Sequence, residues 1–237
     1  MVSIEYVAIA PCSGLFFMVR FHLITLFPEV CEPYLTASIV GRARKEKKIG
    51  VTYQNPRDFV TNKWGKVDER PYGGGPGMVM TALPVVKAVK KSLSRKKGKK
   101  PTIVWFTPGG KQFTHKDAER FSKQDDVVFV CGRYEGIDAR AISMLRTFGK
   151  VEKFSVGPYI LTGAELPALT MIDVTTRRIP GVLGKDESVE ERRVASRDVY
   201  TRPETILWEG KKLRVPKVLQ GGNHAEIEKW KKKINKE

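Results

Sequence analysis

The chain has 237 residues, 41% of them hydrophobic, and a formal net charge of +17 at pH 7. This length suits one large domain, or one domain with a small appendage, and the apolar runs are too short to cross a bilayer. The excess of cations favours a polyanionic partner such as nucleic acid, with a surface charged only for solubility as the plainer alternative.

The first 17 residues, "MVSIEYVAIAPCSGLFF", are apolar but lack the basic start of a signal peptide. The sequence resumes at Met18 as if at a second start, so we interpret residues 1–17 as an N-terminal extension or as the product of a misplaced start codon. The following "RFHLITLF" predicts a buried strand, and Pro28 then begins a charged helical stretch that runs to about Lys48.

Three later apolar segments predict further strands, at 102–106, 126–131 and 151–156. A capping box formed by Thr114 and Asp117 predicts a helix after the first of them. A second helix, ending at about residue 146, follows the next strand. Strand, loop and helix alternate along the chain, which predicts an α/β fold with a largely parallel sheet.

A third helix begins near Pro167, whose missing N–H is harmless in the first turn, and ends near Arg178. One side of this helix is expected to be buried, and it carries Leu166, Leu169, Ile172 and Val174.

Loops rich in Gly or Pro leave the ends of three predicted strands, at 107–111, 132–138 and 157–167. In parallel sheets, ligands bind at the carboxyl ends of the strands. We therefore expect these three loops to form one pocket, within a domain that spans residues 18–183.

The composition changes after this domain. Residues 184–197, "GKDESVEERRVASR", are charged and nearly free of large apolar side chains, which predicts a flexible linker. Residues 198–237 are expected to form a small helical domain. It ends in a helix that Asn223 and Glu226 cap, with Ile227, Trp230 and Ile234 on one face.

A basic run from Lys87 to Lys100 holds eight cations and no acid. Such a run can contact phosphates without regard to sequence, and it can equally be a solvated helix end and loop. Both interpretations stay open.

The three cysteines and three histidines predict neither a disulfide framework nor a metal site. The cysteines are odd in number and have no C-x-x-C spacing, so a reducing cytosol is the expected compartment. They are Cys12, Cys31 and Cys131, and the histidines are His22, His115 and His224.

The segment "VDERPYGGGPGMVM" (67–80) has four glycines and two prolines within seven residues. It matches neither the P-loop nor the dinucleotide fingerprint, because it lacks the lysine, the spacing and the preceding strand. The loops "GRYEGID" and "GPYILTGAELP" lack clustered cations and suit a flat, uncharged group such as a nucleobase. Glu135 and Glu165 could meet a positive group, so a cationic, adenine-bearing cofactor fits better than a triphosphate.

Eight strings occur in order along the chain: "LITLFPE", "PRDF", "VDERPYGGGPGM", "CGRYEGID", "GPYILTGAELPA", "IPGVLG", "YTRPE" and "GNHAEI". Together they closely resemble the bacterial tRNA (guanine-N1)-methyltransferases, TrmD, of the SPOUT superfamily. The resemblance runs from Met18 to about Trp230. It implies an α/β domain with a trefoil knot, which general topology rules would have excluded.

The resemblance also implies an activity. Members of this family transfer a methyl group from S-adenosylmethionine to N1 of the guanosine 3′ of the anticodon (position 37 of tRNA). They are homodimers with each active site at the subunit interface. The expected partners are therefore tRNA and a second copy of the chain, with no membrane, and whether a divalent ion assists stays open.

The family's cofactor-binding positions fall here on the three Gly- and Pro-rich loops. They are Trp105, Phe106, Thr107, Pro108, Gly110, Gly132, Tyr134, Glu135, Val156, Gly157, Pro158, Tyr159, Ile160, Leu161, Gly163 and Pro167. Trp105 replaces a frequent tyrosine, Pro158 an aspartate and Ala164 a glycine.

The residues matching the family's guanine-binding part are Asp68, Arg70, Pro76, Gly77 and Ser188. The glycine-rich segment is then expected to let backbone approach a flipped-out base.

Guanine N1 carries a proton at neutral pH, so its methylation needs a base near N1 and a cation near O6. The resemblance assigns the cation to Arg177. The expected base position holds Arg192, which cannot accept a proton. We therefore expect a nearby linker carboxylate, Glu191, to be the base, with Glu190, Glu187 and Asp186 as alternatives.

Two other functions remain open at this point. Arg192 favours an RNA- or cofactor-binding protein of SPOUT fold with impaired catalysis. An NTP-binding enzyme is disfavoured because the P-loop pattern fails.

Overall fold

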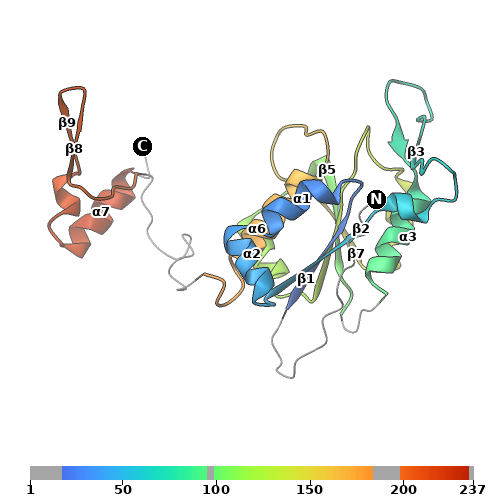
Figure 1. Ribbon diagram of the computed structural model, residues 1–237, viewed down its shortest axis with the longest axis horizontal. Helices are drawn as coiled ribbons and strands as arrows, with labels where there is room; N and C mark the ends of the chain where they lie inside the picture. The colour runs from blue at the N-terminus through green and yellow to red at the C-terminus, as the bar shows by residue number, and fades with distance from the viewer. Residues whose placement is uncertain (1–17, 95–98, 184–197, 235–237) are drawn as a thin grey trace. The chain divides into compact units, whose positions relative to one another are not determined.

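The structure, a computed structural model, describes residues 18–94, 99–183 and 198–234 (Figure 1). The chain divides into two compact units, Met1–Val182 and Leu183–Glu237. Residues 1–17, 184–197 and 235–237 lie outside the description, and with them the expected extension and linker. Within the described residues, no helix is long and apolar enough to span a membrane.

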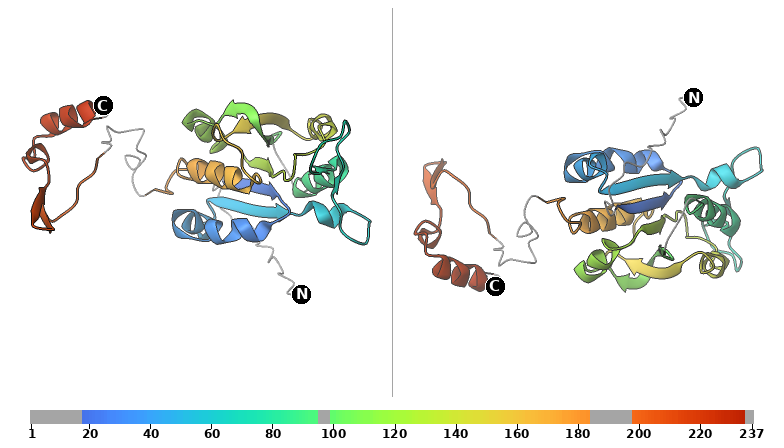
Figure 2. Two further views of the ribbon diagram at one scale, coloured as in Figure 1. Left: turned by 90° about the horizontal axis from the view of Figure 1, so that it is seen from above. Right: turned by 90° about the horizontal axis from the view of Figure 1, so that it is seen from below.

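The first unit is built on a five-stranded sheet in which every neighbouring pair is parallel. The order across the sheet is β2 (Ile49–Gln54), β1 (Val19–Ile24), β6 (Asp126–Val130), β5 (Thr102–Gln112) and β7 (Lys150–Ser155). Figure 2 shows β1 and β2 side by side near one edge. The predicted α/β class and parallel sheet are confirmed.

Helices cover both faces of this sheet. One face packs against α1 (Pro28–Leu35), α2 (Ser38–Lys45), α4 (His115–Phe121) and α6 (Glu165–Thr176). The other packs against α3 (Ala82–Ser92), α5 (Arg140–Leu145) and the 3-10 turn η1 (Pro56–Phe59). In Figure 1, α1, α2 and α6 lie to one side of the strands and α3 to the other.

The alternation of side chains in β1 explains why two cores form. Phe21 and Leu23 point into the core on the α6 side, whereas Ile24 belongs to the core on the α3 side. The strand β6 is buried along its whole length, as a central parallel strand should be. Phe21 and Phe129 meet across β1 and β6 with ring centroids 6.0 Å apart. Each such fully buried side chain contributes roughly 1.5–3 kcal/mol of transfer free energy.

Several elements differ from the sequence prediction. The charged stretch after Pro28 is two helices, α1 and α2, interrupted at Thr36 and Ala37. The strand β2 and the two-residue strands β3 (Asp68–Glu69) and β4 (Val79–Met80) were not predicted.

The prediction for α6 was partly wrong. Leu166 is 57% exposed, whereas Leu169 and Ile172 are buried as expected. The reason is helical geometry, because Leu166 shares its side of the helix with the exposed Thr170 rather than with the core residues.

The second unit is not purely helical, which corrects the expectation for residues 198–237. It contains an antiparallel hairpin of β8 (Thr205–Trp208) and β9 (Lys211–Arg214). A 3-10 turn, η4 (Lys217–Leu219), precedes the terminal helix α7 (His224–Ile234). Asn223 Oδ1 accepts from the N–H of Glu226 at 3.4 Å, so the predicted capping by Asn223 is present. Trp230 of α7 packs beside Tyr200, 6.3 Å between ring centroids.

Candidate functional site

A pocket of about 490 Å³ opens at the carboxyl ends of β5, β6 and β7. The three Gly- and Pro-rich loops expected to meet there all contribute to its lining. It lies where open parallel sheets bind ligands, because the strands end there and the following loops are free to diverge.

The first loop is a bulge within β5. The ladder with β7 breaks after Phe106 and resumes at Lys111, so the residues between them leave the sheet. Gly110 packs against the backbone of Phe154, where an added Cβ would lie 2.6 Å from the carbonyl carbon. Gly110 therefore lies outside the pocket lining, and its expected contact with the cofactor stays a prediction.

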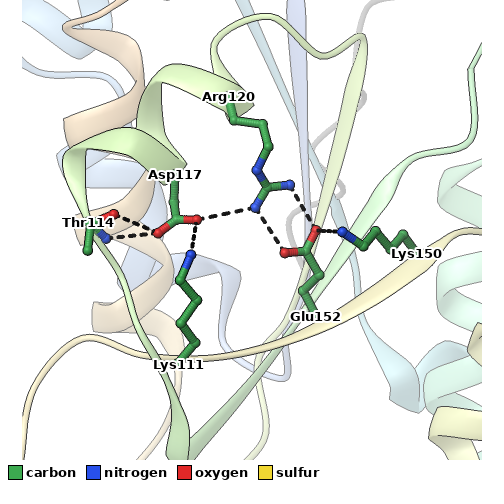
Figure 3. Close-up of polar contacts among 6 residues, drawn as sticks. All are labelled: Lys111, Thr114, Asp117, Arg120, Lys150 and Glu152. Atoms are coloured by element: carbon green, nitrogen blue, oxygen red, sulfur yellow. Dashed lines mark hydrogen bonds and ion pairs between the residues drawn. The ribbon is translucent and has the colours of Figure 1, made fainter.

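Ion pairs hold the residues that follow this bulge (Figure 3). Lys111 Nζ lies 2.6 Å from Asp117 Oδ1, and the backbone N–H of Thr114 donates to Asp117 Oδ2 at 3.2 Å. Arg120 bridges from Asp117 to Glu152 on β7, with Nη1 2.8 Å from Glu152 Oε1. This network fixes β5 beyond the loop to both α4 and β7, and it contains the predicted capping box.

Asp117 is ionised despite its burial. Desolvation raises its pKa, but hydrogen bonds from Lys111 and Thr114 outweigh that effect and leave the pKa below its usual value. Asp117 is therefore charged at neutral pH, and its ion pairs hold the chain in place directly after the first loop.

The second loop, residues 132–137, is joined to the third. Arg133 and Gly163 form an isolated antiparallel bridge, and the N–H of Ala164 donates to Gly132 O at 3.2 Å. Within the second loop, Tyr134 has a left-handed backbone conformation, with φ of 58°. These contacts make two loops that are far apart in the sequence into one wall of the pocket.

The glycine-rich segment reaches the same wall from β4. Glu135 N donates to Met78 O and Met80 N donates to Gly136 O, each at 2.9 Å. Gly73, Gly74 and Gly75 all have positive φ and no heavy atom within 4 Å of an added Cβ, leaving their backbone open. Gly77, in contrast, lies directly against the Glu135 side chain.

The pocket contains most of the residues expected to bind the cofactor. Its lining includes Trp105, Phe106, Thr107, Pro108, Gly132, Tyr134, Glu135, Val156, Gly157, Tyr159, Ile160, Leu161, Gly163 and Pro167. Pro158 is exposed and outside the lining. Among the additional lining residues are Arg133, Ile137 and Thr162, which stand within the quoted strings, and Phe154 and Ser155, which end the strand β7.

Glu165 differs from its expected role. It is only 1% exposed and lies beneath the pocket rather than in its lining. Its carboxylate accepts from Thr25 and pairs with Arg133, so it meets a positive group of the chain itself and not one of a ligand.

The expected guanine-binding and catalytic residues that the structure describes lie outside the pocket lining. Asp68 is in β3, and Arg70 and Pro76 are exposed on the segment between β3 and β4. Arg177 is the C-cap of α6, at the far end of the helix from Pro167. Glu191, Ser188 and Arg192 fall in 184–197, outside the described residues.

No group of three or more potential metal ligands occurs among the residues that the structure describes. Their two cysteines, Cys31 and Cys131, are free and buried. Burial, followed by the charge of Glu165, raises the pKa of Cys31 to about 12.

Comparison with known proteins identifies the family. The sequence profile described as tRNA (Guanine-1)-methyltransferase TrmD matches residues 19–237. The chain belongs to this family.

Several similar proteins carry the name tRNA (guanine-N(1)-)-methyltransferase. That of Clostridioides difficile (strain 630) is 43% identical over 217 residues, covering 90% of each chain. That of Lachnospira eligens is 44% identical over 215 residues, 89% of this chain and 87% of the relative. That of Buchnera aphidicola subsp. Acyrthosiphon pisum is 41% identical over 221 residues, which cover 91% of this chain and 89% of the relative.

These matches confirm the resemblance drawn from the sequence strings. The family is one of methyltransferases that act on guanine N1 of tRNA, and the matches do not favour the alternative of a binding protein with impaired catalysis.

Proposed function

We propose that this protein transfers a methyl group from S-adenosylmethionine to N1 of the guanosine at position 37 of tRNA. The observation that carries the proposal is the pocket itself. Fourteen of the sixteen residues that the family resemblance assigns to the cofactor line one cavity at the carboxyl ends of β5, β6 and β7. A protein of this kind acts where tRNA is found, in the cytoplasm, and the two buried free thiols of the described residues fit a reducing compartment.

The residues present fit an adenosine-bearing cation. The cavity volume of about 490 Å³ is within the roughly 300–1,000 Å³ usual for small-molecule sites. Apolar walls from Trp105, Ile137 and Leu161 suit a flat base, and backbone groups of the loops supply hydrogen bonds. The carboxylate of Glu135 provides a negative charge at the lining, which favours a sulfonium centre.

When bound, S-adenosylmethionine supplies an electrophilic methyl group. The protein must then do two things at the guanine: remove the N1 proton and stabilise the charge that gathers on O6. We propose Arg177 for O6, because a guanidinium is always charged and donates in a fixed plane. We propose Glu191 as the base that accepts the N1 proton.

Arg177 acts in the pocket of a second subunit. Pro167 lines the pocket and Arg177 follows ten residues later along α6, roughly 15 Å at the rise of an α-helix. Its own chain therefore holds the guanidinium too far from its own pocket to meet the same guanine.

Exposed apolar side chains support such a dimer. Val30 and Tyr34 on α1 and Leu166 on α6 are all more than a third exposed, on two helices that pack together. Tyr34 Oη donates to Asp173 at 2.5 Å, which joins the two helices into one surface. Exposed apolar side chains that lie on adjoining helices favour a protein–protein interface. In a dimer with a two-fold axis, each subunit would contribute this same surface.

We also propose that the chain forms the trefoil knot of its family. Its path supports the idea: after the edge strand β7, residues 163 and 164 return beside residues 132 and 133 in the middle of the sheet. The chain then enters α6, which packs against α1 and α2 on the β1 side.

The test is methyl transfer to a tRNA transcript with guanosines at positions 36 and 37, followed by digestion and mass spectrometry of the nucleosides. We expect one N1-methylguanosine per tRNA, and none when position 37 is changed to adenosine. Binding of S-adenosylmethionine without any methylated nucleoside would reject the proposal.

A further inference from the structure

Glu165 is a buried charge at the start of α6 that the proposed chemistry does not use. Its Oε1 accepts from Thr25 Oγ1 at 2.7 Å, from the end of β1. Its Oε2 lies 3.0 Å from Arg133 Nε. That N–H is not aligned with the oxygen, so the contact is an ion pair and not a hydrogen bond. The carboxylate thus links β1, α6 and the second loop of the pocket.

The Arg133 side chain is enclosed on three sides. Its guanidinium lies over the ring of Phe27, 4.6 Å from the centroid, and Nη1 donates to Thr162 O at 3.5 Å. A Cβ added to Gly163 would stand 2.3 Å from Arg133 Nε. Arg133 fills the space that a side chain at position 163 would need, so only glycine fits there. The backbone of Gly163 lines the pocket.

Stability alone does not account for this pair. Desolvating two charges costs about as much as their attraction returns, so apolar residues of similar volume would stabilise the fold at least as well. What an ion pair adds is a defined position for each partner. Here the pair holds Arg133 where its backbone forms the bridge with Gly163, and this bridge is part of one pocket wall.

We propose that Glu165 is a positioning residue. Its buried carboxylate holds Arg133 and thereby fixes residues 132–137 of the second loop and residues 160–164 of the third loop in the arrangement that binds the methyl donor. This inference rests on the proposed function for the identity of that donor. Glu165 acts through Arg133 and contacts no ligand.

The test is calorimetric binding of S-adenosylmethionine, in the absence of tRNA, to the wild type and to Glu165→Gln. Glutamine keeps the shape and the acceptor for Thr25 but removes the charge that holds Arg133. We expect the Kd to rise on the order of tenfold, with a matching rise in KM for the methyl donor and a KM for tRNA within about twofold. Arg133→Lys, which keeps the charge but loses the planar contact with Gly163 and Thr162, should weaken binding in the same way.

The matched control is Glu32→Gln. Like Glu165, Glu32 pairs with an arginine and accepts from a hydroxyl: its Oε1 lies 2.8 Å from Arg44 Nη1 and its Oε2 2.6 Å from Tyr53 Oη, but it is outside the pocket lining. Its Kd should stay within about twofold of the wild type. A purely structural role for Glu165 predicts a lower Tm for Glu165→Gln with unchanged Kd, and that result would overturn the inference.

Different results would reject the proposed function and the positioning role of Glu165. If the wild type binds the donor but methylates no tRNA, the proposed function is lost while the binding comparison still decides the role of Glu165. If Glu165→Gln does not fold, Arg133→Lys decides it, and an unchanged Kd in that variant would contradict the positioning role. If the wild type binds no S-adenosylmethionine, both proposals are rejected.

Discussion

Gly77 and Glu135 lie in direct contact, and only the missing side chain of the glycine permits it. A Cβ at position 77 would stand 2.6 Å from Glu135 Oε1 and 2.7 Å from its Cγ. The glycine-rich segment, expected to hold the guanine, therefore rests on a side chain that lines the pocket. The segment expected to hold the guanine therefore contacts the pocket proposed to hold the methyl donor.

Replacing Gly77 with alanine tests the importance of this contact. Either Glu135 or the segment must move, and a displacement of an ångström at a reacting centre costs on the order of 100-fold in rate. We expect kcat for tRNA methylation to fall by about that factor, measured under saturating donor and tRNA.

The control is Gly73→Ala. Both glycines have positive φ, of 82° and 85°, so both variants bear a similar backbone cost of about 1 kcal/mol. No heavy atom lies within 4 Å of a Cβ at position 73. Equal losses of activity in the two variants would show that backbone strain, and not the contact with Glu135, is responsible.

A buried ion network at the opposite end of the sheet should govern acid stability. Arg20 donates to both oxygens of Asp126, at 2.7 and 2.8 Å, and His22 Nε2 lies 2.9 Å from Oδ1. Burial raises the pKa of Asp126, but the bonds from His22 and Arg20 outweigh it and hold the pKa well below its usual value. Stability from this group is therefore present above the unfolded pKa of about 3.9 and lost as pH falls towards the folded value.

Asp126→Asn should cost about 3 kcal/mol in the free energy of unfolding at pH 7, because it leaves Arg20 without its charge partner. The variant should also lose less stability than the wild type between pH 5 and pH 2, measured by urea denaturation. Glu69→Gln, which breaks an exposed pair with Lys66, should cost less than about 1 kcal/mol and keep the pH dependence. Parallel pH curves for Asp126→Asn and the wild type would contradict this account.

The two described cysteines should be inert in the folded protein. Burial raises the pKa of both thiols, that of Cys31 to about 12, so almost no thiolate exists at pH 8. In a Cys12→Ser background, iodoacetamide should leave native protein unlabelled and modify both remaining cysteines after unfolding in urea. Rapid labelling of the native protein, followed by mass spectrometry, would refute their burial.

Much of the site could be predicted because its signals are local. Gly and Pro follow apolar strands at 107–111, 132–138 and 157–167, and parallel sheets bring such loops to one edge. The pairing of Glu165 with Arg133 could not be predicted in this way, because it joins residues that only the folded chain brings together. Glu165 was therefore expected to face a ligand, although the chain supplies its partner.

Other differences have equally specific causes. The strands β3 and β4 are two residues each, too short for any alternation to be visible. The hairpin β8–β9 turns at Glu209 and Gly210, which both have positive φ, but its strands are exposed and β9 is rich in cations, so no buried pattern marks it. Arg177 was assigned from its motif, and its distance from the pocket became visible only with the length of α6.

We propose that Arg177 of one subunit completes the pocket of the other, and mixed dimers test this arrangement. Arg177→Ala should retain S-adenosylmethionine binding but lose about 100- to 1,000-fold in kcat. Gly163→Val should lose binding, because its side chain takes the space of Arg133. Each variant alone is then inactive.

When the two variants are mixed one to one and subunits exchange, half of the dimers are mixed. Each mixed dimer has one site with an intact pocket and an intact Arg177, so about a quarter of wild-type activity should return. If every pocket used the Arg177 of its own chain, no site in any mixed dimer would be complete. Activity that stays at the level of the separate variants would therefore contradict the account.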